Sequence, residues 1–361
     1  MAQKKTGSHS TNRPSGKSSS GSGRPTSHSG VSRSKSNKRA LNWGLIAAIA
    51  LLLSVYLVVT LFYGRGWEGW KDSWNDLRGN VSSMMAGLPE ELGSPAETPL
   101  VPADETVKTV QVHFVDVGQG DCILIQGNGQ AVLIDAGEND QGDRVAGYLV
   151  SVGVTSLDLA IGTHPHSDHI GGLDVVLEQI PAEEVWMPDL PDSLIPTTRT
   201  YEDLLDAISE TGAEGVLAQP GDSLEICGGL LEVLGPLKDY DNLNDMSLVT
   251  KFTYGDKAFL FTGDMEKIPE SDLLAAGADL KADVLKMGHH GSSTSSGKAF
   301  VQTVDPDIFV IEVGEGNSYG HPHREILALL KELSAEVWRT DLNGNIVMTC
   351  DGSSITVSSD R

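Results

Sequence analysis

The run from Thr163 to Gly172 (THPHSDHIGG) concentrates side chains that bind metal ions. Three histidines and an aspartate stand within six residues, namely His164, His166, Asp168 and His169. Imidazole nitrogens and carboxylate oxygens are the ligands that Zn²⁺ prefers, and Mn²⁺ or Fe²⁺ accept them as well. A solvated polar loop is the alternative, but other histidines of the chain also fall into clusters. The run therefore predicts a metal site.

The stretches on either side of the run indicate how these ligands are held. Residues 157–162 (LDLAIG) form an apolar stretch typical of a buried strand, and residues 173–180 have the pattern of a helix. The ligands would then lie on a strand-to-helix loop, where side chains converge and a helix N-terminus can face an anion.

Together with four further segments, this run resembles a known family. H-x-H-x-D-H followed by two glycines is similar to the signature of the metallo-β-lactamase fold. The four segments narrow the resemblance to the ComEC-like branch, the hydrolase domain of competence proteins. They are Phe114 to Asp121 (FVDVGQGD), Phe261 to Asp264 (FTGD), Leu285 to Ser292 (LKMGHHGS) and Asn317 to His323 (NSYGHPH). The resemblance covers about residues 109–357 and not the N-terminal third, and the many-pass membrane channel of ComEC proteins is not seen.

The resemblance implies an α/β fold, the αββα sandwich, with the site at the sheet edge between its two halves. It also implies two divalent metal ions, Zn²⁺ or Mn²⁺, that activate water. His164 and His166 would hold one ion, and Asp168 and His169 the other. Asp264 matches the carboxylate that bridges the ions, although a helix N-cap is its alternative interpretation.

The pair His289 and His290 is expected to complete the second metal site. A strand ends just before the pair and Gly288 permits close approach, so His289 is favoured as the ligand. His290 would then support the ligands or contact substrate, and the opposite order stays open. The catalytic residues implied are Asp168, His290 and His321.

One departure from the wider fold concerns the segment between His169 and Asp264, which contains no histidine. The wider fold usually places another histidine ligand there. Asn244, Asp245 or Ser247 could supply an oxygen ligand instead, or water could fill the place. Fewer imidazoles shift the preference of such a site towards harder ions such as Mn²⁺.

Four other residues have supporting or open roles. His321 is expected to face the metals as a proton donor or a phosphate clamp. A helix cap is the alternative for both His321 and His323. Asp116 and Asp121 are expected to orient the ligand histidines or the glycine turn without binding metal themselves.

Charge is distributed unevenly along the 361 residues. Residues 1–40 carry nine Lys or Arg and no acid, so the rest of the chain holds 17 bases against 50 acids, a net charge of −33. Such a field repels polyanions at long range, and nothing in the sequence resembles the basic stripe of a strong DNA binder. The three cysteines, Cys122, Cys227 and Cys350, predict buried free thiols, with one disulfide as the alternative.

The N-terminal third predicts a membrane anchor. Residues 1–40 are expected to be a disordered basic tail. Residues 41–63 are uncharged and mostly apolar over 23 residues, enough for the roughly 20 that a spanning helix needs. A cleavable signal is the alternative. The basic residues before this helix place the N-terminus in the cytoplasm and the catalytic domain outside the cell. Residues 64–108 would be a juxtamembrane segment and linker, and residues 109–361 the hydrolase domain.

From residue 110 onward the sequence predicts alternating strands and helices, ending in a hairpin through Asn343 and Gly344. Besides the elements around the ligand run, strands are expected at 110–117, 122–126, 131–134, 215–218, 223–227, 230–234, 247–254, 258–262, 282–287, 307–312 and 336–339, and helices at 142–151, 297–304 and 323–333.

The function expected is that of a membrane-anchored extracytoplasmic phosphodiesterase or nuclease. The resemblance adds DNA as a substrate, DNA uptake as a process and a separate DNA-channel protein as a partner. Hydrolysis of a small ester, lactone or β-lactam by the same centre is the first alternative. A non-enzymatic metal-binding or scaffold protein is the second.

Overall fold

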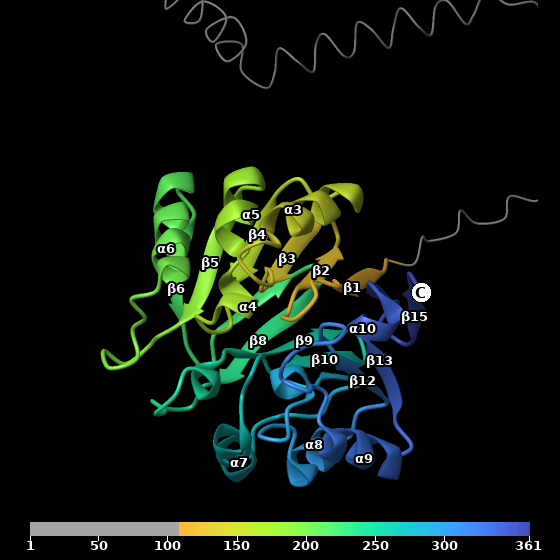
Figure 1. The fold of residues 1–361 in the computed structure, drawn as a ribbon. Helices are drawn as coiled ribbons and strands as arrows, with labels where there is room; N and C mark the ends of the chain where they lie inside the picture. Colours follow the sequence, from red (N-terminus) through yellow and green to blue (C-terminus); the bar gives the residue numbers. More distant parts are fainter. Residues whose placement is uncertain (1–107) are drawn as a thin grey trace, which may run out of the picture. The chain divides into compact units, whose positions relative to one another are not determined.

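A computed structural model describes residues 108–361 of the chain (Figure 1). The predicted cytoplasmic tail, the predicted spanning helix at 41–63 and nearly all of the linker lie outside the described residues. Within the described part, the chain has no helix that combines the length and the apolar character needed to cross a bilayer. The membrane anchor and the domain boundaries therefore stay predictions.

Two β-sheets form the centre of the domain. The first has eight strands in the order β15-β14-β1-β2-β3-β4-β5-β6, and the second has seven in the order β13-β12-β11-β10-β9-β8-β7. The first sheet contains β1 (Val110–Phe114), β2 (Ile123–Gly127), β3 (Gln130–Ile134), β4 (Leu157–Ile161), β5 (Ala182–Pro188), β6 (Glu214–Ala218), β14 (Ile346–Cys350) and β15 (Ile355–Ser359). The second contains β7 (Ser223–Ile226), β8 (Gly229–Gly235), β9 (Val249–Tyr254), β10 (Lys257–Phe261), β11 (Val284–Lys286), β12 (Ile308–Ile311) and β13 (Glu336–Arg339).

Helices cover the outer face of each sheet (Figure 1). The first sheet carries α3 (Gly142–Ser151), α4 (Ser167–Ile170), α5 (Leu173–Gln179) and α6 (Arg199–Thr211). The second carries α7 (Lys267–Ala276), α8 (Lys298–Val304) and α9 (Arg324–Glu332), and the one-turn helix α10 (Thr340–Asn343) leads back to the first sheet. Two short 3₁₀ turns, η1 (Asn244–Met246) and η2 (Gly288–Gly291), lie in loops.

Three clusters of buried apolar side chains hold these four layers together. The central cluster joins the inner faces of both sheets and includes Phe114, Phe259 and Phe261. The other two clusters pack each sheet against its own helices. Along β1 the side chains of Val110, Val112 and Phe114 face the central cluster, as the two-residue period of a strand requires. The predicted αββα sandwich is therefore confirmed.

The topology brings the ends of several strands to one edge. Strands β3 and β4 are parallel, as are β10, β11 and β12. Parallel strands end at the same side of a sheet, so the loops that follow them are neighbours. This edge receives the ligand run after β4, Asp264 after β10 and the histidine pair after β11.

The hairpin predicted through Asn343 and Gly344 is wrong. Strand β13 pairs in parallel with β12 in the second sheet, whereas β14 lies between β1 and β15 in the first. Between them α10 and the left-handed Gly344 redirect the chain from one sheet to the other. The interior position gives β14 two hydrogen-bonded neighbours and buries Ile346, Met348 and Cys350, which a terminal hairpin would not do.

Candidate metal centre

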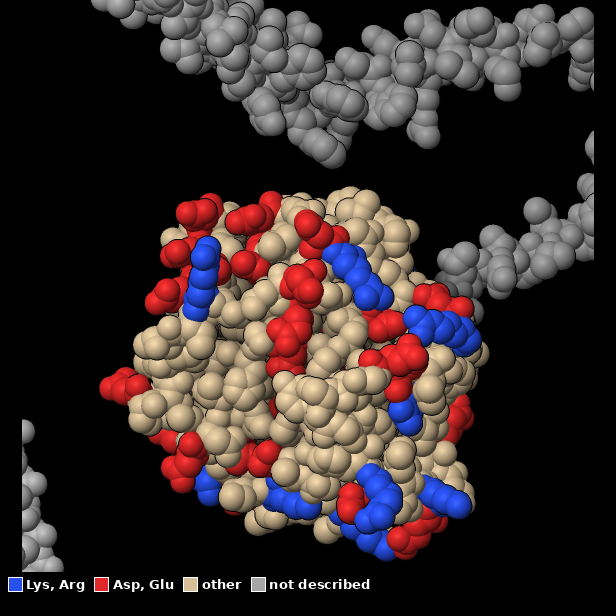
Figure 2. All heavy atoms as spheres, viewed as in Figure 1, with Lys and Arg blue, Asp and Glu red and all other residues tan. Residues whose placement is uncertain are grey.

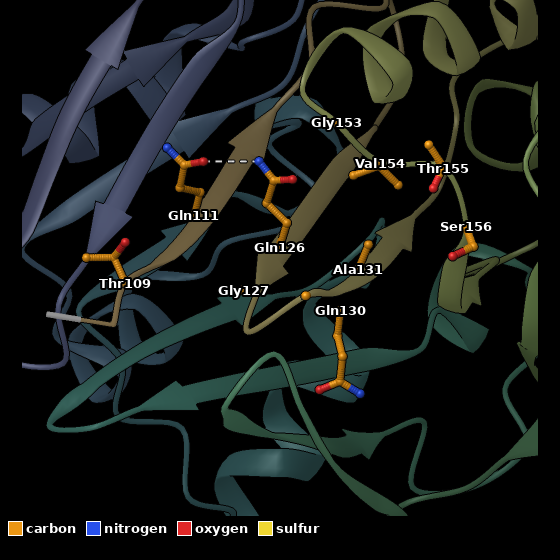
Figure 3. Close-up of a pocket in the computed structure, with 11 residues that line it drawn as sticks. Thr109, Gln111, Gln126, Gly127, Gln130, Ala131, Gly153, Val154, Thr155 and Ser156 are labelled. Carbon is orange, nitrogen blue, oxygen red and sulfur yellow. Dashed lines mark hydrogen bonds between the residues drawn. The ribbon is translucent and has the colours of Figure 1, made fainter. Parts of the chain in front are cut away.

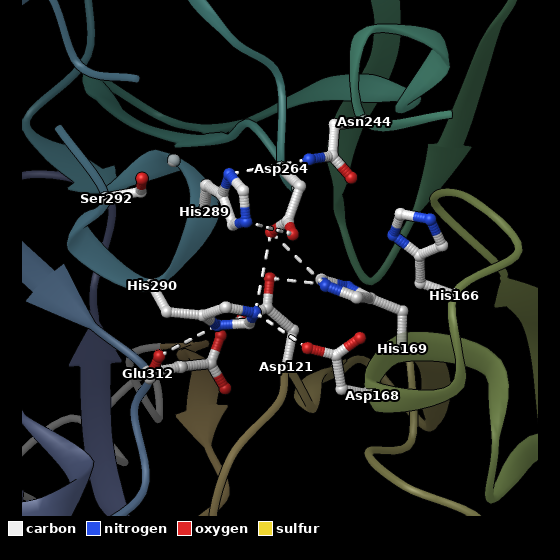
Figure 4. A network of polar contacts seen from close by, with 12 residues as sticks. Asp121, His166, Asp168, His169, Asn244, Asp264, His289, His290, Ser292 and Glu312 are labelled. Atoms are coloured by element: carbon white, nitrogen blue, oxygen red, sulfur yellow. Dashed lines mark hydrogen bonds and ion pairs between the residues drawn. The ribbon is translucent and has the colours of Figure 1, made fainter. Parts of the chain in front are cut away.

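Loops from both sheets bring five histidines and two aspartates together at this edge. Figure 4 shows Asp264 in the middle, with the histidine pair on one side and the ligand run on the other. Several of these side chains line a hollow of about 330 Å³. It is lined by Gln119, His166, Ser167, Asp168, Asn244, Asp264, His289, His290, Tyr319 and His321.

His169 is oriented by a buried aspartate behind it. Its Nδ1 lies 2.8 Å from Asp135 Oδ2, and a carboxylate oxygen accepts, so Nδ1 carries the proton. Asp135 is fixed in turn by the backbone N–H of Thr163 at 2.8 Å and by its hydroxyl at 2.6 Å. The other ring nitrogen of His169, Nε2, therefore presents a lone pair, 3.2 Å from Asp264 Oδ1.

His290 is oriented in the same way from the opposite side. Its Nδ1 donates to the backbone carbonyl of Glu312 at 3.0 Å and lies 3.2 Å from Asp121 Oδ1. Both neighbours are acceptors, so Nδ1 again carries the proton. Its Nε2 points at Asp168 Oδ2, 3.2 Å away, and at Asp264 Oδ1, 3.6 Å away.

The buried atoms at the centre of the site favour the binding of a positive charge. Within residues 108–361, His169 Nε2, His290 Nε2 and Asp264 Oδ1 are buried and form no hydrogen bond. Lone pairs that face carboxylate oxygens repel unless a proton or a metal cation lies between them. Burial alone would lower the pKa of His290, but the Asp264 and Asp121 carboxylates raise it to about 10. The site attracts positive charge, and the residues present fit a divalent metal ion.

The geometry groups the ligands into clusters that could each hold an ion. His164, His169 and Asp264 form one, and Asp168, His169 and His290 form another. His166 joins the first, because its Nδ1 lies 3.0 Å from His164 Nε2. Burial lowers the pKa of His164, which keeps its imidazole neutral and able to bind metal.

The distances favour the opposite order of the histidine pair from the one expected. His290 is buried beside Asp168, while His289 is partly exposed. His289 Nε2 lies 3.6 Å from Asp264 Oδ2, but its Nδ1 faces Glu266 at 3.4 Å and Thr294 at 3.2 Å. Both histidines adopt left-handed backbone conformations with φ of 51°, so the chain turns sharply and the second ring points inward.

The segment between His169 and Asp264, which contains no histidine, places Asn244, Asp245 and Ser247 in three different roles. Ser247 Oγ lies 3.3 Å from His164 Nδ1 and accepts from the Asp264 backbone N–H at 3.1 Å, so it supports both ligands. Asp245 accepts from Asn242 and from the Glu266 backbone, which ties down the loop. Asn244 lines the hollow, and its buried Oδ1 forms no hydrogen bond with the described residues. Asn244 is therefore the one placed to offer an oxygen ligand.

Three other predicted residues lie in different surroundings. His321 lines the hollow and stacks on Tyr319, with ring centroids 5.6 Å apart. Burial, together with the nearby histidines, lowers its pKa to about 4. His323 accepts from the Ser293 backbone N–H at 2.8 Å and precedes α9; it does not line the hollow, but its ring centroid lies 4.7 Å from that of His321. Asp116 accepts from the Gly118 N–H and so braces the glycine turn.

The sequence reasoning missed three buried charged residues behind the ligands, namely Asp135, Lys286 and Glu312. Each stands at the end of an apolar strand, or just after one: VLID, VLK and FVIE. A charged residue in such a position rarely belongs to the core unless it is paired, and this signal could have identified them. All three cysteines are buried and free, as predicted.

A second hollow of about 300 Å³ lies at the opposite ends of β1, β2 and β3 (Figure 3). None of its lining residues is charged or a histidine, so it offers no comparable chemistry. They are Thr109, Gln111, Gln126, Gly127, Gly129, Gln130, Ala131, Gly153, Val154, Thr155 and Ser156.

Comparison with known proteins identifies relatives of the described domain. The chain is 34% identical over 255 residues to "ComE operon protein 3" of Bacillus subtilis (strain 168), covering 65% of this chain and 32% of that protein. It is 30% identical over 248 residues to "Competence protein ComA" of Neisseria gonorrhoeae, covering 68% and 32%. The chain thus spans about a third of the length of these relatives.

Among solved structures, CmlA, a diiron beta-hydroxylase from Streptomyces venezuelae, is similar with a TM-score of 0.46 and 13% identity. The match covers 67% of this chain and 54% of that one. The sequence model of the family described as "Metallo-beta-lactamase superfamily" matches residues 115–313. These residues include the ligand run, Asp264 and the histidine pair. The chain therefore belongs to the metallo-beta-lactamase superfamily, whose members are metal-dependent hydrolases.

Proposed function

We propose that this protein is a membrane-anchored, extracytoplasmic hydrolase of phosphodiesters that works with two divalent ions, Zn²⁺ or Mn²⁺. The observation that carries the proposal is the convergence of His169 Nε2, His290 Nε2 and Asp264 Oδ1, which form no hydrogen bond within residues 108–361. Hydrogen bonds on the far side of each imidazole hold both lone pairs towards the same space.

The ligand assignment follows the distances. One ion would be held by His164, His166 and Asp264, with Asn244 Oδ1 beside them. The other would be held by Asp168, His169 and His290, and Asp264 is close enough to contribute a carboxylate oxygen to this group as well. His289 is then left at the rim of the hollow, where it can contact substrate.

Divalent ions in this centre would supply Lewis-acid chemistry, which lowers the pKa of water and polarises a substrate oxygen. The chain's own residues then orient and bind. Asp168 can take a proton or hold a water in the hollow. His321 Nδ1 forms no hydrogen bond with any described residue, so its ring remains available to a phosphoryl oxygen or a leaving group.

The substrate class rests on the competence-related relatives. Phosphodiesters, with DNA as one of them, fit proteins named for competence and recombination. We extend the proposal to a role in DNA uptake, with a separate channel protein as partner, because these relatives carry names that refer to competence. The predicted helix at 41–63 would anchor the domain to the membrane.

A metal-by-substrate screen on the full-length chain tests the proposal. With Mn²⁺ or Zn²⁺, we expect cleavage of bis(p-nitrophenyl) phosphate and single-stranded DNA. Cleavage of nitrocefin alone would defeat the phosphodiester assignment in favour of a small-ester or β-lactam hydrolase. Tight metal binding with no turnover of any substrate would instead indicate a non-enzymatic role.

A further inference from the structure

Lys286 is a fully buried lysine directly beneath the metal centre. It is the last residue of β11, and its side chain is 0% exposed. An ammonium group in such a place is costly unless charges and hydrogen bonds satisfy it. Its Nζ is in contact with the Asp121 carboxylate and donates to the Gly263 carbonyl at 3.0 Å. The carboxylates of Asp121, Asp264 and Glu312 all favour its charged form.

Each of these two contacts leads to a metal ligand. Asp121 lies 3.2 Å from His290 Nδ1 through one carboxylate oxygen and 3.8 Å from His169 Nδ1 through the other. Gly263 directly precedes Asp264 and has a left-handed φ of 48°, so its carbonyl direction helps to set where Asp264 points. Figure 4 shows Asp121 below Asp264, between His290 and His169.

Lys286 also joins the two halves of the domain. Asp121 lies in the loop between β1 and β2 of the first sheet, whereas Lys286 ends β11 of the second sheet and Gly263 lies in the loop after β10. The Asp121 backbone N–H donates to the Asp168 carbonyl at 3.1 Å, so the same loop touches the ligand run. A single cation thus fixes loops from both sheets where they meet the ligands.

We infer that Lys286 is a positioning residue of the metal centre, which holds Asp121 and the Gly263 carbonyl so that His290 Nε2 and Asp264 face the same ion. The inference rests on the metal-binding part of the proposed function and on no particular substrate. Residues that orient ligands from behind typically change metal affinity by about 10–100-fold when they are removed.

The test compares Lys286→Met and Lys286→Gln with Lys251→Met in the full-length chain. Lys251 is a matched control, because it is 5% exposed on β9 and pairs with Asp279 at 2.9 Å away from the centre. Each protein is stripped of metal and titrated with Co²⁺ and Zn²⁺ against a chromophoric chelator. The Co²⁺ absorption bands report the ligand geometry, and urea unfolding reports stability.

We expect Lys286→Met to bind one equivalent of metal about 10–100-fold more weakly and to alter the Co²⁺ bands. Lys286→Gln keeps an N–H donor and should recover part of the metal affinity and part of the wild-type Co²⁺ spectrum. Lys251→Met should lose stability while its affinity and bands stay those of the wild type. Two tight equivalents with unchanged bands in Lys286→Met would overturn the inference.

A variant that fails to fold does not leave the question open. The double variant Lys286→Met/Asp121→Asn removes both charges and keeps an oxygen for His290, so it should fold and still bind the second ion weakly. If all three Lys286 variants unfold while Lys251→Met folds, Lys286 serves the fold and the positioning role is rejected. If the wild type itself binds no metal, the proposed function fails before the inference is reached.

Discussion

Asp264 is the residue on which the metal centre converges. Its carboxylate oxygens lie within 3.2–3.8 Å of nitrogens from His164, His169, His289 and His290. Burial would raise the pKa of Asp264, but the surrounding histidines hold it well below its ordinary value. The carboxylate is therefore ionised and lies close to histidines that come from loops of both sheets.

Replacing Asp264 with alanine should abolish turnover while the fold persists. The loss should exceed the roughly 100-fold upper range seen when residues that only support ligands are removed. Phosphodiester hydrolysis and bound metal, measured by elemental analysis, check this. Asp203→Ala, at a partly exposed position on α6, serves as the control and should keep both. Wild-type rates in Asp264→Ala would refute the assignment.

Glu270 makes stability depend on pH in an unusual direction. It is buried on α7 and accepts from the Ser296 and Gly297 backbone N–H groups, yet burial raises its pKa from 4.5 to about 7. Between pH 4.5 and pH 7 the Glu270 carboxyl is therefore ionised more fully in the unfolded chain than in the folded one. The contribution of Glu270 to the free energy of unfolding therefore falls as pH rises from about 4.5 to 7, by on the order of 3 kcal/mol.

Glu270→Gln should remove this dependence. Urea unfolding of both proteins at pH 5 and pH 8 measures the difference in their free energies of unfolding. The variant should gain on the wild type at the higher pH, because its side chain never ionises. A difference that is the same at both pH values would contradict the raised pKa of Glu270.

At the scale of elements, the ligand run depends on how α4 and α5 are joined. Gly171 and Gly172 connect the two helices, and a Cβ at Gly171 would overlap the Ser167 carbonyl and the Asn139 backbone nitrogen. Neither backbone atom can move without shifting the ligand loop or the loop after β3. The glycine is needed for close approach and not for a left-handed conformation, since its φ is −60°.

Gly171→Ala should destabilise the protein by about 1–3 kcal/mol, the range of typical overpacking, and weaken metal binding at the adjacent His169. Thermal or urea unfolding and metal titration measure the two effects. Gly147→Ala on the exposed face of α3 is the opposite control, because nothing lies within 4 Å of its added Cβ. It should stabilise by about 0.5–1 kcal/mol through helix propensity. Equal behaviour of the two variants would disprove the packing argument.

At the scale of the whole molecule, the negative net charge of the protein repels the DNA that is proposed as its substrate. The chain beyond residue 40 carries a net charge of −33. On the face shown in Figure 2, acidic side chains are spread widely, and the described residues form no continuous basic surface there. A polyanion that approaches this face meets long-range repulsion, which binding at the metal centre would have to overcome.

Salt should consequently speed the encounter with DNA, where an ordinary DNA-binding protein is slowed. Raising the ionic strength from about 0.01 to 0.15 M shortens the screening length from about 30 to 8 Å. We expect kcat/KM for a single-stranded oligonucleotide to rise at least about threefold at fixed metal concentration. The small ester bis(p-nitrophenyl) phosphate should respond less. A steep fall for the oligonucleotide would reveal a basic track on another face.

The proposed topology has a separate test. If residues 41–63 span the membrane with the N-terminus inside, protease added to intact protoplasts should remove the C-terminal domain and leave an N-terminal tag protected. The opposite pattern would place the catalytic domain in the cytoplasm.

The sequence by itself revealed a cluster of candidate metal ligands and an order of strands and helices, and its resemblance to a known family implied the sandwich. His164, His166, Asp168 and His169 are contiguous, so their spacing is visible without a fold, and the alternation of short strands and helices is local too. The passage from β13 to β14 was not predictable, because turn residues at Asn343 and Gly344 do not reveal which sheet the next strand joins.

Only the tertiary structure decided which of His289 and His290 points inward and what stands behind the ligands. The Cys122 backbone N–H donates to the Glu312 carboxylate, 190 positions further along the chain. Lys286, in the second sheet, contacts Asp121 in a loop of the first sheet. Sequence patterns give the period of an element but not the direction of a side chain in a sharp left-handed turn. Those directions are fixed by long-range packing, which exists only after the two sheets have come together.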